Sequence, residues 1–494
     1  MNDSEAVTKP SQRLNQRAGS PEVGHLALRT TREHTVGRIV IIVGVVAYAS
    51  LLVACYANAI APAFAYLGYT LEPAAPPYLA LGFALSVLPA AWLPQRLERP
   101  SASVLWIIYL LAYVPSTLMP FLSLTRPAPD VVLLVLAIGT AFAVLSLVPN
   151  LPLLRLRRLR VRPRWFWWAF VATCAFFILQ IASEHGAAID LPSLSAVYDV
   201  REEYKEADAS RLSRLGVSWI GNVLAPFAIA LALVRRRPLL ALPALALQAY
   251  LFSITGFRSL LFATVVLVVL LVGSTTRGRF FGAYLAWGGS ALITVSWVLD
   301  QMLETIFFTS TFVRRLIVSP GMLTSWYYDF FSDNPKVRLA HSVFAPWLDY
   351  PYDVAPPFLI AARYFGREQT YANANFWADA FANFGFSGLF AFTLVVAGIL
   401  WLSDALAGSR DPARTRLAAL LLGVPAFTLS NTALTTTVWT HGLALALIVL
   451  FLLPREITAG ATERHATRPA HGDPRSHLPG SNRSEQHDAG VAPS

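Results

Sequence analysis

The sequence predicts an all-α fold: a polytopic transmembrane helical bundle of about 12 spans with a large outer loop that carries short helices. Hydrophobic residues make up 55% of the chain and charged residues only 14%, whereas ordinary soluble domains carry about 25% charged residues. Apolar runs of roughly 18 to 23 residues recur along most of the chain, and each is long enough to cross about 30 Å of hydrocarbon. Arginines gather in the short segments between these runs, as is typical of membrane-protein loops.

The two ends of the chain are polar. Residues 1–36 lack a hydrophobic period, and residues 456–494 are rich in Arg, Gly, Pro and His. Neither segment can bury a core, so we expect both to be disordered tails. Cys55 and Cys174, the two cysteines of the sequence, each lie in an apolar run, which argues against a disulfide framework or a cysteine metal site. We therefore expect no metal and no cofactor.

Between the tails, residues 37–455 form the predicted transmembrane helical domain. Two long polar segments, 184–215 and 304–377, interrupt it. In the first of them Glu202 and Glu206 are four residues apart within an acidic stretch, which indicates a short surface helix. The predicted spans cover approximately residues 38–60, 77–93, 101–122, 130–150, 165–183, 216–234, 238–255, 259–274, 281–303, 379–406, 416–431 and 433–453.

The distribution of arginines predicts the orientation. With both termini in the cytoplasm, the basic loops lie inside, including the run of six arginines at 155–164, and the short outer loops carry few Lys or Arg. That run could suggest nucleic-acid or phosphoinositide binding, but we interpret it as a cytoplasmic anchor that fixes the topology. Both long polar segments then face outside. We expect a multi-pass protein of the cell membrane that contacts membrane lipids and no nucleic acid.

Arg258 is the most informative single residue. It lies in a tight turn at 255–259 between two predicted spans, and the span after it offers only about sixteen apolar residues, or roughly 24 Å of helix. The turn therefore holds Arg258 at or slightly below the outer interface. Either the side chain snorkels to lipid headgroups, or its guanidinium binds a phosphate at the membrane surface through two hydrogen bonds.

Segment 304–377 mixes ionisable side chains with aromatic rings. The mixture is typical either of a site for a sugar or of an interfacial aromatic belt over a solvated loop. Arg363 and Arg367 are four residues apart and would share one face of a helix. Outward-facing arginines at bilayer level, Arg314 and Arg315 included, suit a lipid pyrophosphate, and a contact to anionic lipid is the alternative.

A histidine or a carboxylate of this region could act as a general base. His341 is the histidine of segment 304–377 and is suited to proton transfer near neutral pH, although a loop histidine is often only solvated. His441 lies in the middle of a span and is interpreted as a bundle or packing residue near the cavity. The carboxylate alternatives are Asp300, Glu304, Asp329, Asp349, Asp353 and Asp379.

Common catalytic signatures are absent from the sequence. It contains no P-loop, HExxH or GxSxG motif and no GxGxxG in strand context. ATP-driven transport and the common soluble chemistries therefore lack support.

Two stretches resemble a known family. The turn at 255–259, Thr-Gly-Phe-Arg-Ser, opens a span, and the stretch 373–388 leads from asparagines into an aromatic-Gly-Phe-Ser-Gly span. With one large outer loop late in a many-span chain, these features resemble the O-antigen polymerases of the Wzy type, or oligosaccharide repeat unit polymerases, which are related to the O-antigen ligases. The resemblance covers about residues 40–455 in layout and is specific over the two stretches.

The resemblance implies a metal-independent glycosyltransferase that joins repeat units carried on undecaprenyl pyrophosphate at the outer face of the membrane. Arg258 and His341 would be catalytic, Arg258 by binding the pyrophosphate and His341 in the manner of the loop histidine of the ligases. A flippase and a chain-length regulator are candidate partners beside the lipid-linked oligosaccharide substrate. The predicted substrate-binding residues are Arg314, Arg315, Arg363, Arg367, Asn373, Asn375 and Trp347.

Two other functions stay open. A ligase would transfer a finished glycan to another acceptor. A transporter or flippase would contain inverted repeats and broken helices that face charged groups at the membrane midplane. No such repeat is evident by eye in the sequence.

Overall fold

The computed structural model describes residues 21–157, 159–189, 197–207, 209–275, 280–342, 344–408 and 411–457. Over these residues the chain is helical, and its extended pairing is limited to an isolated bridge between Glu72 and Ser123. The predicted all-α class is thus confirmed for the described part of the chain. Most of the two predicted tails lies outside it.

Among the described residues the helices follow one another without sheet elements. The α-helices are α2 (Pro21–Cys55), α3 (Ala61–Phe64), α4 (Pro76–Val87), α5 (Pro100–Ile108), α6 (Val114–Leu122), α7 (Ala128–Leu145), α8 (Pro163–His185), α9 (Val197–Glu206), α10 (Arg211–Trp219), α11 (Ala225–Val234), α12 (Leu242–Thr255), α13 (Arg258–Thr275), α14 (Phe281–Met302), α15 (Ser319–Asp333), α16 (Pro356–Phe365), α17 (Phe376–Ala407), α18 (Pro412–Leu429), α19 (Leu434–Trp439) and α20 (Leu443–Leu452). The π-helical turns are η1 (Tyr56–Ile60), η4 (Tyr109–Tyr113), η6 (Ile220–Leu224) and η8 (Thr309–Val318), and the 3-10 turns are η2 (Ala65–Leu67), η3 (Leu88–Ala91), η5 (Val148–Asn150), η7 (Pro238–Ala241) and η9 (Ala345–Trp347).

Nine helical segments of the described chain are long and apolar enough to cross a membrane. They coincide with nine of the predicted spans. Two further predicted spans correspond to shorter apolar helices, Pro76–Ala91 and Phe262–Thr275, and α18 at the eleventh predicted span is not among the nine. The structure therefore supports a multi-pass membrane protein, and the count of about twelve spans is not confirmed.

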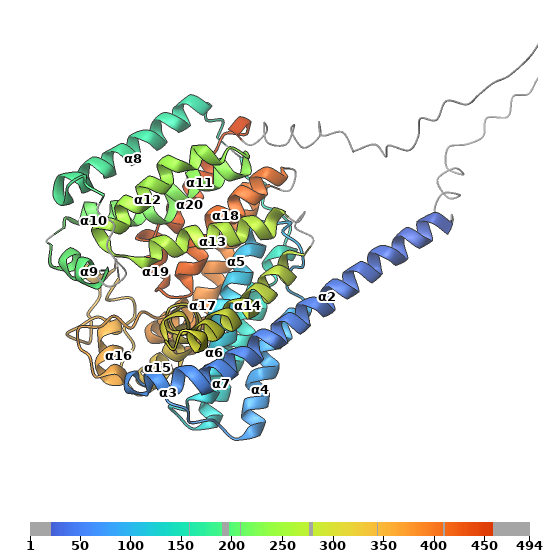
Figure 1. Ribbon diagram of the computed structural model, residues 1–494, viewed down its shortest axis with the longest axis vertical. Helices are drawn as coiled ribbons and strands as arrows, with labels where there is room; N and C mark the ends of the chain where they lie inside the picture. Colours follow the sequence, from blue (N-terminus) through green and yellow to red (C-terminus); the bar gives the residue numbers. More distant parts are fainter. Residues whose placement is uncertain are drawn as a thin grey trace, which may run out of the picture.

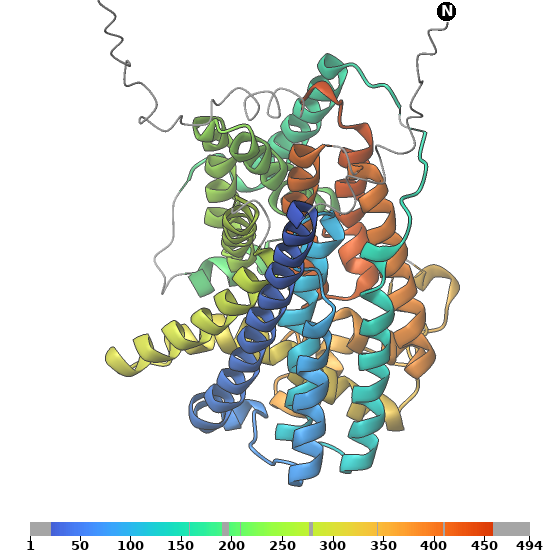
Figure 2. The same cartoon turned by 90° about the vertical axis from the view of Figure 1, so that its right-hand side faces the viewer.

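The bundle has two groups of helices joined through α5, α17 and α18. Figure 2 shows α2 in dark blue, the blue to cyan α4 and α6, and the teal α7 side by side, and these helices contact one another in sequence. The green helices α8, α10, α11, α12 and α13 form the second group (Figure 1). Helix α18 packs against α5 on one side and against α11 and α13 on the other. In Figure 1, α9 and α16, from the two long polar segments, lie on the left, opposite the beginning of α2.

The N-terminal helix starts earlier than predicted. Helix α2 begins at Pro21, so residues 21–36, expected in the disordered tail, continue the first span as helix. Part of the segment after the initial proline consists of Leu, Ala, Glu and Arg, which favour a helix, although its Thr, Val, His and Gly residues favour it less.

The prediction of one large outer loop is wrong for its first half. Within 304–377, η8 and α15 run without interruption from Thr309 to Asp333, and α15 packs between α6 and α17. Trp326, Tyr327 and Phe331 are buried in the hydrophobic core. Because the rings of α15 fill the space between two helices, they are core residues rather than exposed platforms for a sugar. The second half of the segment carries the short helix α16, as predicted.

Arginines at one end of the bundle satisfy carbonyls where helices end. Arg38 donates to the carbonyls of Ala90 and Leu93 at the end of η3, and Arg416 donates to that of Ser274 at the end of α13. Arg235 donates to the carbonyl of Ile457, the last residue that the structure describes. The last carbonyls of a helix have no partner within it, so a guanidinium is a favourable donor there. The arginines that predict the topology therefore also hold helix ends together.

The approach of α15 to α6 gives a stability prediction. A Cβ built on Gly321 would lie 2.4 Å from the backbone oxygen of Pro115, whereas one built on Gly288 in α14 would meet nothing within 4 Å. We expect Gly321→Ala to destabilise the protein by about 1–3 kcal/mol, because α15 must move away from α6. Thermal unfolding in detergent measures the effect.

Gly288→Ala is the matched control, because it makes the same change inside a helix without the clash. Its melting temperature should equal or exceed that of the unsubstituted protein, since alanine favours a helix over glycine. Equal melting temperatures for the two variants would show that α15 and α6 are not in the close contact described.

Candidate functional site

A cavity of about 460 Å³ lies at the end of the bundle that carries the two long polar segments. Its volume is within the range of sites for small ligands. Three arginines line it: Arg201 from α9, Arg214 from α10 and Arg315 from η8. The described residues of its wall include no Asp or Glu, so its charged side chains are all basic. The rest of the wall is formed by Tyr204, Val217, Ser218, Asn222, Gly256, Phe257, Ser259, Leu260, Phe262, Leu316, Asn373, Val424, Phe427, Thr428, Asn431, Thr432, Thr440 and His441.

The predicted tight turn forms part of this wall. Gly256 ends α12 in a left-handed conformation with φ 60°, and its N–H donates to the carbonyl of Phe252. Glycine adopts this conformation without the steric cost that a side chain would bring. Helix α13 then begins at Arg258, between two residues that line the cavity, Phe257 and Ser259. The side chain of Arg258 lies outside the described residues.

Helical irregularities surround the cavity. The π-turn η6 contributes Asn222, and η8 contributes Arg315 and Leu316. The last candidate span breaks between α19 and α20, where Gly442 has φ 84° and Thr440 and His441 face the cavity. π-turns occur often at functional sites. Non-helical backbone at membrane depth is tolerated where it is buried in protein or lines a water-filled cavity.

His441 belongs to a polar cluster in the cavity wall. Its Nδ1 lies 3.2 Å from Ser218 Oγ and 3.3 Å from Asn222 Nδ2, and the two neighbours are themselves bonded, with Asn222 Nδ2 donating to Ser218 Oγ at 3.2 Å. A histidine held by such partners can give or take a proton at its other nitrogen. Sequence reasoning interpreted His441 as a bundle residue. The sequence Thr440-His441-Gly442, which interrupts an otherwise apolar run, is the feature that could have indicated a polar site here.

His341 lies elsewhere. Its Nε2 is 3.9 Å from Asp379 Oδ1, and its Nδ1 is buried without a hydrogen-bond partner. Asp379 is held in turn by the side chain of Asn383 and the backbone N–H of Leu434. Burial lowers the pKa of the His341 imidazole. His341 is not among the described residues of the arginine-lined cavity, so the structure does not bring it together with the turn that carries Arg258.

Two of the predicted arginines have different surroundings. Arg315 lines the cavity, but Arg314 is buried on the other side of η8. The Arg314 guanidinium lies 4.2 Å from the ring centre of Phe64 and donates to Ser310 Oγ at 2.9 Å. This cation–π contact gives Arg314 a packing role in the bundle.

The predicted pair on α16 does not share a helix face. Helix α16 ends at Phe365 because Gly366 adopts φ 62°, so Arg367 lies beyond the helix that carries Arg363. Both arginines are exposed, as is Trp347, at 76% of its surface. The four-residue spacing therefore does not align the two guanidinium groups.

The two predicted asparagines have different roles. Asn373 is exposed and lines the cavity. Asn375 is buried at the N-terminus of α17, where its side-chain oxygen accepts hydrogen bonds from the N–H groups of Trp377 and Ala378. Its amide donates to Thr324 Oγ1 and to the carbonyl of Pro320. These contacts make Asn375 an N-cap that joins α17 to α15.

Several of the alternative carboxylates also have structural partners. Asp300 accepts hydrogen bonds from the N–H groups of Phe308 and Thr309 and so caps the start of η8. Asp329 accepts a hydrogen bond from the hydroxyl of Tyr364 and forms an ion pair with Arg126. Glu304, Asp349 and Asp353 do not line the cavity. His441 is the histidine of the described cavity wall.

Comparison with protein-family models, curated proteins and solved structures finds no match for the chain.

The surroundings of His341 give a pH prediction. Because burial holds the pKa of His341 below the value of about 6.5 that it has in an unfolded chain, the unfolded chain binds a proton that the folded protein excludes. His341 therefore costs stability as the pH falls through about 6.5. The melting temperature of the protein should drop more steeply than that of His341→Gln between about pH 7.5 and about pH 5.5. Parallel curves for the two proteins would contradict the buried neutral histidine.

Proposed function

We propose that the protein is an integral-membrane polysaccharide polymerase that joins undecaprenyl-pyrophosphate-linked oligosaccharide repeat units at the outer face of the cytoplasmic membrane. The observation that carries the proposal is the cavity lined by Arg201, Arg214 and Arg315, with the turn of Arg258 in its wall and no acid among its described residues. Guanidinium groups bind phosphate oxygens through paired, charge-assisted hydrogen bonds. A lipid-borne diphosphate that entered this cavity would meet these guanidinium groups.

The reaction requires charge stabilisation and one proton transfer. A hydroxyl of the acceptor sugar attacks the anomeric carbon of the donor, the bond from that carbon to the pyrophosphate oxygen breaks, and polyprenyl pyrophosphate leaves. Arginines around the leaving group offset its developing charge, which is commonly the largest catalytic contribution in such sites. The proton of the attacking hydroxyl goes to a base. His441 is favoured for this role because it lies in the cavity wall, and the sequence-predicted His341, which lies elsewhere, is the alternative.

A ligase and a polymerase would use the same chemistry and differ in the acceptor. Purified protein given one kind of lipid-linked repeat unit separates them. A polymerase makes a ladder of products, whereas a ligase leaves the unit unchanged until another acceptor is added.

A transporter or flippase is the second candidate. The break between α19 and α20 beside a cavity with three arginines favours it, because transporters place broken helices around their substrate sites. Protein in sealed vesicles distinguishes the two functions. Movement of a lipid-linked sugar between leaflets without new glycosidic bonds supports transport, and lengthened glycan supports polymerisation.

The arginine cavity gives a prediction for activity. We expect Arg258→Ala, Arg214→Ala and Arg315→Ala each to lower the rate of polymer formation by about 100-fold, because each removes a donor to the leaving diphosphate. The measurement is the length and amount of glycan made from a lipid-linked repeat unit by purified protein.

Arg211→Ala is the matched control. Arg211 lies on α10, one turn before Arg214, is exposed and does not line the cavity. Its loss should leave the product ladder almost unchanged. Full-length polymer from Arg258→Ala at the unsubstituted rate would exclude the proposed role of this arginine.

A further inference from the structure

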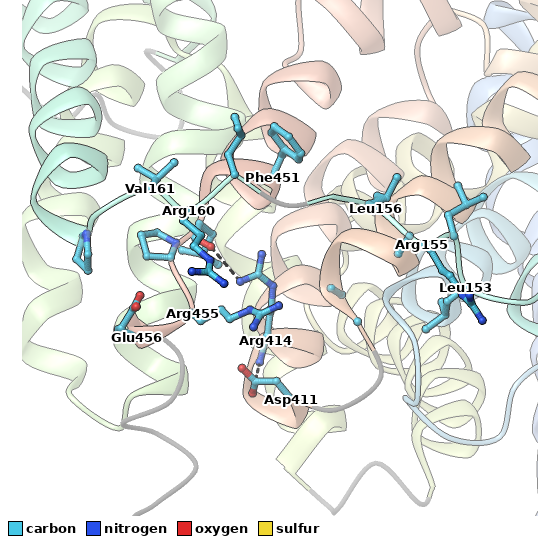
Figure 3. Close-up of a pocket in the computed structure, with 18 of the residues that line it drawn as sticks. Leu153, Arg155, Leu156, Arg160, Val161, Asp411, Arg414, Phe451, Arg455 and Glu456 are labelled. Atoms are coloured by element: carbon cyan, nitrogen blue, oxygen red, sulfur yellow. Dashed lines mark hydrogen bonds between the residues drawn. The ribbon is translucent and has the colours of Figure 1, made fainter.

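A second cavity, of about 1020 Å³, lies at the opposite end of the bundle (Figure 3). Helix α18 connects the two cavities, because Arg414 in its first turn lines this one and Phe427 near its end lines the first. At 1.5 Å per residue the two positions are roughly 20 Å apart along the helix. The second cavity is formed where α17 and α20 end, where α18 begins, and by the segment that links α7 to α8.

The cavity is basic. Its described wall contains five arginines and two carboxylates: Arg155, Arg160, Arg162, Arg414, Arg455, Asp411 and Glu456. Asp411 caps α18, since its Oδ1 accepts hydrogen bonds from the N–H groups of Ala413 and Arg414. The partial positive charge at the start of the helix offsets part of the negative charge of this carboxylate. The wall therefore presents an excess of positive charge to any occupant.

Arg414 provides a fixed charge in the wall of this cavity. Its side chain is 2% exposed, and its guanidinium donates to the carbonyls of Leu406, Leu450 and Leu453 at the ends of α17 and α20. These bonds lock the guanidinium in one orientation. Figure 3 shows Arg160, Arg414 and Arg455 in the centre of the cavity, with Arg155 farther to one side beside Leu153.

The segment at 151–162 contributes both polarity and apolar surface. Two side chains hold the start of the segment: Arg99 donates a hydrogen bond to the carbonyl of Leu151, and Trp401 donates one to the carbonyl of Pro152. The described residues of the segment form no helix. Arginines alternate along it with leucines and a valine. The apolar residues of the cavity wall, which would contact a hydrocarbon chain, are Leu153, Leu154, Leu156, Leu159, Val161, Phe451 and Leu453.

We propose that this cavity binds the phosphate headgroup of an anionic phospholipid, with the first part of an acyl chain against the leucines of segment 151–162. Basic clusters at the ends of membrane helices attract anionic lipid by about 1 kcal/mol for each Lys or Arg. Several arginines together with an adjoining apolar wall match a ligand that is an anion at one end and hydrocarbon at the other. The arginine run thus has a binding role beyond its role in topology.

Lipid retention by the whole protein tests the site. Protein purified from nanodiscs that contain equal amounts of phosphatidylglycerol and phosphatidylcholine is examined by native mass spectrometry. Retained phosphatidylglycerol should exceed retained phosphatidylcholine by roughly tenfold or more, since several arginines contribute. Equal retention of the two lipids overturns the proposal. A second arm adds inorganic pyrophosphate, and complete displacement of the lipid by it at micromolar concentration would show a site for a free anion instead.

Variants locate the bound lipid. Arg160→Gln and Arg455→Gln should each lower the retained phosphatidylglycerol by about fivefold, because each removes one of the charges that attract the headgroup. Arg157→Gln is the matched control, since Arg157 belongs to the same exposed run and does not line the cavity. An equal loss in all three variants would mean that general surface charge, and not this cavity, holds the lipid. An unchanged melting temperature shows that a variant is folded. The comparison of phosphatidylglycerol with phosphatidylcholine on the unsubstituted protein tests the proposal even if a variant does not fold.

Discussion

Backbone polar groups without helical partners are the main constraint on this fold. In an apolar bundle each unpaired N–H or carbonyl costs free energy unless protein or water satisfies it. The chain meets this constraint in two ways. At one end, arginines such as Arg38, Arg414 and Arg416 donate to the carbonyls of helix ends. At the other end, the π-turns η6 and η8, the turn at Gly256 and the break at Gly442 surround the cavity that three arginines line. Irregular backbone and the candidate site therefore occupy the same place.

The sequence contained enough information to locate most helices. Long apolar runs identify the nine candidate spans, because length and hydropathy are local properties. The turn before Arg258 was also predictable, since Thr-Gly between two apolar runs ends one helix and permits the next. Helix α15 was not predictable in the same way. Its aromatic and charged residues resemble a loop when read singly, and only packing against α6 and α17 shows that they are buried.

The arginines illustrate why the candidate site could be predicted only in part. Arg314 and Arg315 are neighbours in sequence, yet one packs over Phe64 and the other lines the cavity. The direction of each side chain depends on the π-helical register of η8, which the pattern of residue types does not specify. Likewise, His441 reaches the cavity because the span that carries it breaks at Gly442. Sequence reasoning found Arg315, Asn373 and the turn of Arg258 and interpreted His441 as a bundle residue or a packing residue near the cavity, but it missed Arg201 and Arg214.

The central claim is that guanidinium groups around the first cavity hold a lipid-borne diphosphate. The most direct measurement is an experimental structure of the whole protein in a lipid nanodisc loaded with undecaprenyl pyrophosphate. We expect the diphosphate to lie in the cavity within hydrogen-bond distance of Arg214 and Arg315, with Arg258 directed toward it from the start of α13. An empty cavity, with Arg258 directed into the acyl chains and the diphosphate bound elsewhere, would contradict it.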